Sequence, residues 1–92
     1  MKIHLYTRYS SHGGTRWMLN ISEATRPETN DFSDIAYEEA ETMGLRLRNH
    51  YMQPFPDDEL EHDMGADEAL ILEHAERVAE RLSAELTLDP PK

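Results

Sequence analysis

The chain has 92 residues, with nineteen Asp and Glu against nine Lys and Arg, so its formal net charge at pH 7 is −10. This length predicts a single small domain over residues 1–92. Cysteine is absent, which excludes disulfides, thiolate metal sites and cysteine nucleophiles. No apolar run approaches the ~20 residues that span a bilayer, and no secretory signal is visible, so we expect a cytoplasmic protein.

The first predicted element is a β-hairpin. Two runs near the N-terminus alternate between apolar and polar residues, which is the period of a β-strand, and in the second run Trp17, Leu19 and Ile21 share one face. The Gly13–Gly14 pair between the runs supplies the positive φ angles of a tight turn. The pattern therefore predicts a hairpin over residues 2–22.

A loop and a first helix are expected next. Residues 23–31 are polar and contain Pro27, which restricts the residue before it to extended conformations, so we expect a surface loop. Apolar residues then recur at helical spacing and predict a helix over about residues 32–53, with Gly44 in its interior. A pair of prolines ends this helix.

The rest of the chain predicts an acidic linker and a second helix. Residues 54–65 are rich in Asp and Glu and form the linker, and apolar residues from Ile71 to Leu86 recur at helical spacing, which predicts a helix over about residues 66–88. As an alternative, the short run Leu86–Leu88 could form a third strand.

The order strand, strand, helix, helix predicts an α+β fold in which the N-terminal hairpin packs on two helices as two layers. The residues expected to share the core are the apolar ones on the inner faces, namely Trp17, Leu19, Ile21, Ala40, Met43, Leu47, Ile71, Val78 and Leu82.

Motifs for catalysis and for cofactors are not found. Residues 57–68 place acids at several positions of a calcium loop, but His62 stands where that loop requires glycine. The five histidines form no HExxH pair, and Gly13–Gly14 lies in no phosphate-binding motif. We therefore expect no catalytic residue, no metal and no cofactor, and a protein that is not an enzyme.

The acids are unevenly distributed along the chain. Residues 1–22 hold three bases and no acid, whereas residues 57–68 hold seven acids and no Lys or Arg. Such a concentration of negative charge repels nucleic acid and lipid headgroups and attracts a basic protein surface. The expected partner is therefore a basic protein surface, with no direct contact to nucleic acid or to a membrane.

The acids at helical spacing and in the acidic stretch can imitate the phosphates for which Lys/Arg sites are built, so they are the predicted interface. An ordinary solvated surface and a solubilising linker are the alternative. Two apolar side chains beside the acidic stretch are candidate anchors of the complex. The predicted partner-binding residues are Asp34, Glu38, Glu41, Asp57, Asp58, Glu59, Glu61, Asp63, Asp67, Glu68, Tyr51 and Met52.

The run Phe32-Ser33-Asp34-Ile35-Ala36-Tyr37-Glu38-Glu39-Ala40 resembles a helix start of the small acidic anti-CRISPR proteins that phages encode against type I surveillance complexes. The resemblance implies an inhibitor in the bacterial host cytoplasm. Such an inhibitor binds the Lys/Arg-rich Cas subunits of the complex, called Cascade, as a DNA mimic and excludes target DNA without a catalytic residue.

Two other function classes remain open. An antitoxin or regulatory module that sequesters a basic partner would also suit a hairpin followed by an acidic helix, although such proteins usually place a third strand before the helix. A subunit of an enzyme or a phage structural accessory has no motif in its favour.

Overall fold

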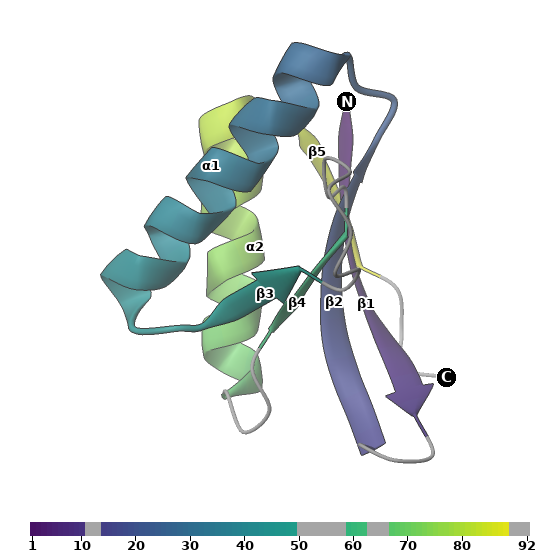
Figure 1. Cartoon of the computed structure of the whole chain (residues 1–92), viewed down its shortest axis with the longest axis vertical. Helices are drawn as coiled ribbons and strands as arrows, with labels where there is room; N and C mark the ends of the chain where they lie inside the picture. The colour runs from purple at the N-terminus through teal and green to yellow at the C-terminus, as the bar shows by residue number, and fades with distance from the viewer. Residues whose placement is uncertain (11–13, 50–58, 63–66, 89–92) are drawn as a thin grey trace.

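The structure is a computed structural model that describes residues 1–10, 14–49, 59–62 and 67–88. Its elements in chain order are β1 (Lys2–Ser10), β2 (Gly14–Ser22), α1 (Arg26–Met43), β3 (Leu47–Asn49), β4 (Glu59–His62), α2 (Glu68–Leu82) and β5 (Glu85–Leu88). The fold is α+β, as predicted: the strands form one sheet in the order β3-β4-β2-β1-β5, and both helices cover the same side of it (Figure 1).

The predicted hairpin is present. β1 and β2 pair antiparallel over their whole length, in a register that runs from Lys2 opposite Ser22 to Ser10 opposite Gly14. The inward alternation also holds, since Leu19 and Ile21 are buried. Both strands lie in the middle of the sheet, because β4 pairs with β2 and β5 pairs with β1.

The first helix begins earlier than the sequence predicts. Residues 26–31, expected in a loop, form the first turns of α1. The Thr25 hydroxyl accepts a hydrogen bond from the Glu28 backbone N–H, and the Glu28 carboxylate accepts one from the Thr25 N–H, which is a complete capping box. Pro27 lies in the first turn, where the helix needs no N–H donor. The proline therefore marks a helix start rather than a loop.

The same helix also ends earlier, so the predicted helix over residues 32–53 is wrong over residues 44–49, and residues 50–53 lie outside the described residues. Gly44 has a φ of 73° and caps α1 in the left-handed region, and its N–H points back to the carbonyls of Ala40 and Glu41. Gly44 therefore terminates the helix instead of lying within it. Leu47–Asn49 then forms the edge strand β3.

Part of the predicted acidic linker is a strand. Within residues 54–65, the structure describes residues 59–62, and these form β4 between β2 and β3. Leu60, Glu61 and His62 are all buried. The local excess of acids predicts a solvated linker. The pairing of β4 with β2 on one edge and β3 on the other, together with the burial of Leu60, stabilises a strand instead.

The second helix is shorter than expected, and the third-strand alternative is confirmed. Ser83, in the left-handed region with a φ of 53°, ends α2 after Leu82. Glu85–Leu88 forms β5, which pairs in parallel with β1 and places Leu86 opposite Ile3. A helix continued to residue 88 would have left this edge of β1 uncovered.

The core lies between the sheet and the two helices. Ile3 and Leu5 from the sheet meet Phe32 and Ala36 from α1. α2 adds Ile71, Ala75 and Val78. Of the predicted core residues, those that are only partly buried are Trp17, Met43, Leu47 and Leu82. No helix within the described ranges is long and apolar enough to cross a membrane.

Candidate functional site

The two layers of the molecule carry very different charge. The two helices, α1 and α2, together contain ten acids and three Lys or Arg residues, and we call them the acidic helix layer. The five strands contain three acids and four Lys or Arg residues. Among the residues that the structure describes, negative charge is therefore concentrated on the side that the helices form.

The α1 part of the acidic helix layer contains three of the predicted partner-binding residues. Asp34, Glu38 and Glu41 are exposed on α1. Asp34 and Glu41 form no ion pair within the part of the chain that the structure describes, and the same is true of the exposed Glu76 and Glu80 on α2. These four carboxylates are available to cations from outside.

Other acids of this layer pair with arginines of α2. Arg81 lies 2.9 Å from a carboxylate oxygen of Glu38 and 3.2 Å from one of Glu39, so it joins the two helices. Arg77 lies 3.7 Å from Glu39 and 3.5 Å from Glu73. The hydrogen bond to Glu38 is the main cause of a raised pKa of Arg81. The pairs tie the helices together, and they leave Asp34 and Glu41 free.

One predicted interface residue, Glu61, lies in the sheet and not on the acidic helix layer. The Glu61 side chain is buried and forms an ion pair with Arg16. The pairing of β2 with β4 sets Glu61 opposite Met18, so alternation places it on the sheet face turned away from the helices. Glu61 therefore holds the sheet together and is removed from the predicted interface.

The remaining predicted residues are scattered. Asp67 caps α2, because its carboxylate accepts a hydrogen bond of 2.9 Å from the Ala69 backbone N–H. Glu68 is exposed in the first turn of α2, and Glu59 begins β4. The predicted residues that lie outside the described ranges are Tyr51, Met52, Asp57, Asp58 and Asp63.

A pair of buried histidines joins the two layers. Nε2 of His62 in β4 lies 3.0 Å from Nδ1 of His74 in α2, and Nε2 of His74 lies 2.8 Å from the Ala36 carbonyl oxygen in α1. Because that carbonyl can only accept, Nε2 of His74 donates to it, and when the His74 ring is neutral its Nδ1 accepts from the Nε2–H of His62. Two neutral rings therefore satisfy this chain of hydrogen bonds.

Burial favours these neutral rings. Loss of hydration lowers the pKa of His62 to about 4, with a further contribution from His74, while the nearby backbone of Trp17 acts weakly in the opposite direction. Burial also lowers the pKa of His74, against the opposing effects of the Ala36 carbonyl and of Glu39. Within the described ranges no third His, Asp or Glu joins them as a metal site. No sequence pattern indicates the pair, because His62 and His74 do not have the spacing of a known motif.

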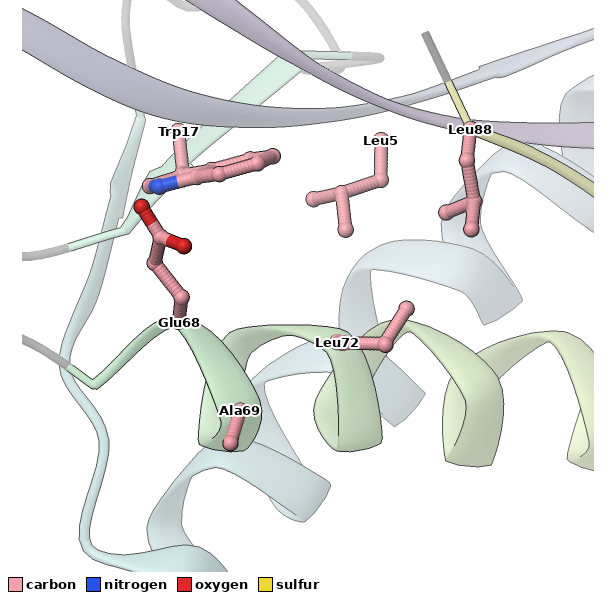
Figure 2. Close-up of a pocket in the computed structure, with 6 residues that line it drawn as sticks. All are labelled: Leu5, Trp17, Glu68, Ala69, Leu72 and Leu88. Atoms are coloured by element: carbon pink, nitrogen blue, oxygen red, sulfur yellow. The ribbon is translucent and has the colours of Figure 1, made fainter. Parts of the chain in front are cut away.

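An open, mostly apolar pocket of about 320 Å³ lies between the sheet and α2. Figure 2 shows the indole ring of Trp17 turned with one face towards α2, and the carboxylate of Glu68 beside the nitrogen-bearing end of that ring. The residues that line the pocket are Leu5, Trp17, Glu68, Ala69, Leu72 and Leu88. Sequence reasoning placed Trp17 in the core and Glu68 on the surface, but it did not bring them together.

Comparisons with known proteins add no relative: no family model, no curated protein and no solved structure matches this chain.

Proposed function

We propose that the chain is a non-enzymatic inhibitor that covers a Lys/Arg-rich, nucleic-acid-binding surface of another protein. The partner that we propose is a Cas subunit of a type I surveillance complex in the bacterial cytoplasm, whose target DNA the acidic surface would exclude. The separation of charge between the two layers is the observation that carries this proposal, because it gives a molecule of net charge −10 one strongly acidic side.

The exposed carboxylates support a phosphate-like role. Asp34 and Glu41 lie two helical turns apart on α1, and Glu76 and Glu80 lie one turn apart on α2. Each is exposed and without an ion pair among the described residues. A guanidinium or ammonium group that binds a phosphate oxygen can bind a carboxylate oxygen in the same way. The remaining charge on this side steers a basic partner towards it.

The direct test is competition for target DNA. A purified type I surveillance complex is incubated with increasing amounts of the protein, and binding of labelled target DNA is measured by fluorescence anisotropy. We expect the protein to bind the complex and to prevent DNA binding in a concentration-dependent way. Absence of binding, or a complex that holds the protein and target DNA together, would overturn the proposal.

A matched pair of variants tests whether the acidic helix layer is the interface. Asp34→Asn with Glu41→Gln removes two charges from this layer, and Glu23→Gln with Glu85→Gln removes two exposed charges outside it. Both variants have the same net charge. At low salt we expect the first to slow association about threefold or more and the second to leave it nearly unchanged. Equal slowing by both would show that net charge, and not this face, governs binding.

A further inference from the structure

The pocket beside Trp17 suggests how a basic partner is anchored. We infer that it binds one arginine side chain of the partner protein, with the guanidinium group between the Trp17 indole and the Glu68 carboxylate. This inference rests on the proposed function for the identity of the partner, but the pocket itself can be tested on the isolated protein.

The polar end of the pocket has the two groups that bind a guanidinium best. Trp17 is partly buried on β2, which fixes its ring, and one ring face is open to the pocket (Figure 2). Glu68 is exposed and forms no ion pair or hydrogen bond among the described residues, although its carboxylate points at the ring. A cation placed here gains both an ion pair and attraction to the aromatic face.

The other wall of the pocket is aliphatic. Leu5 on β1 and Leu72 on α2 project into the pocket from opposite sides, and Leu88 of β5, which also lines it, is 53% exposed (Figure 2). These side chains would cover the three methylene groups of an arginine stem. At about 320 Å³ the pocket is at the lower limit of small-molecule sites, so its size suits a side chain better than a cofactor.

Charge selects among the possible occupants. An anion would be repelled by Glu68 and by Asp67, which caps the same helix end and offsets the partial positive charge of the helix N-terminus. A neutral apolar group would bury part of the Glu68 carboxylate without a partner. Arginine is favoured over lysine because its planar guanidinium can stack on the indole and still donate two hydrogen bonds to the carboxylate.

The test uses three small probes with the same backbone: Nα-acetyl-arginine amide, Nα-acetyl-lysine amide and Nα-acetyl-norleucine amide. Trp17 is the only tryptophan of the chain, so its fluorescence reports on the pocket, and the methyl NMR signals of Leu5, Leu72 and Leu88 report on the aliphatic wall. We expect saturable changes in both signals with the arginine probe at the lowest concentration. Equal or tighter binding of the norleucine probe, or of the lysine probe, would overturn the arginine assignment.

Variants locate the probe. Glu68→Gln should weaken the arginine probe about fivefold or more, whereas Glu76→Gln, the same change on the same helix away from the pocket, should leave it unchanged. Ala69→Leu fills the pocket from an exposed helix position and should also weaken binding. Unaltered methyl spectra without probe verify that each variant is folded. Equal weakening by Glu68→Gln and Glu76→Gln would overturn the site. The probe experiments use the isolated protein. A failure of the arginine pocket would therefore not affect the result of the DNA-competition test.

Discussion

The acidic helix layer and the sheet use glutamate in opposite ways. On the helices, Glu38 is exposed and meets Arg81 across the surface, where water and salt screen the pair. In the sheet, Glu61 is buried and meets Arg16 in a pair that is largely removed from water. Burial therefore divides the acids of one short chain into those that support the sheet and those that lie on the surface. Their number or density in the sequence does not separate the two groups.

The largest effect should come from breaking the sheet pair. Arg16→Gln removes a cation that pairs with the buried Glu61 carboxylate, and we expect a loss of about 3 kcal/mol in the free energy of unfolding, measured by urea denaturation. Arg46→Gln is the matched control, because Arg46 is exposed and forms no ion pair among the described residues. A loss no larger than that of the control would remove the distinction between the two layers.

The second effect concerns the histidine junction between the layers. A pKa of about 4 for His62 in the folded protein, against about 6.5 when unfolded, means that the unfolded chain binds more protons between these values. The contribution of His62 to the free energy of unfolding is therefore fully present above pH 6.5 and decreases as the pH falls towards 4. From pH 7 to pH 5 we expect a loss of about 2 kcal/mol from His62 alone, and the lowered pKa of His74 acts in the same direction.

Urea denaturation at these two pH values measures the loss. His62→Gln should reduce it, while His4→Gln should retain it, because His4 lies on the opposite face of the sheet and bonds Ser22. NMR titration of the histidine ring protons gives an independent reading. A His62 ring that titrates near pH 6.5 in the folded protein would contradict the buried neutral pair.

The smallest effect should come from the surface pairs of the helix layer. Arg81→Gln removes the hydrogen bonds that the exposed Arg81 side chain donates to Glu38 and Glu39. We expect only a small fall in melting temperature at low salt, and none in about 1 M NaCl, because such pairs are screened. A fall as large as that of Arg16→Gln, or one that persists in high salt, would show that the helix layer also depends on its charges.

Much of the fold follows from local patterns. Alternation and Gly13–Gly14 predict the hairpin, and helical spacing predicts the centres of α1 and α2. The start of α1 was predictable as well, since Thr25 and Glu28 have the spacing of a capping box. β3 and β4 were not predictable in the same way. Each is three or four residues long, and what makes it a strand is a partner far away in the sequence.

The candidate site is less predictable than the fold. The exposure of Asp34 and Glu41 follows from helical periodicity, because they lie opposite the buried Ala36 and Ala40. The burial of Glu61 depends on the register of β4 against β2. The sequence does not indicate this register, because the surrounding acids favour a solvated linker over a strand. The pocket joins the ends of α2 and β5 to the hairpin, so it exists only once the sheet is assembled.

The parallel pairing of β5 with β1 has a consequence for biosynthesis. The ribosome makes β1 first of the five strands and β5 last, so the edge of β1 that receives Glu85–Leu88 stays open throughout synthesis of the segment between them. An open strand edge next to Ile3 and Leu5 is a template for pairing with another nascent chain. The sheet is therefore completed only after β5 has left the exit tunnel, and until then the open edge of β1 is exposed to other chains.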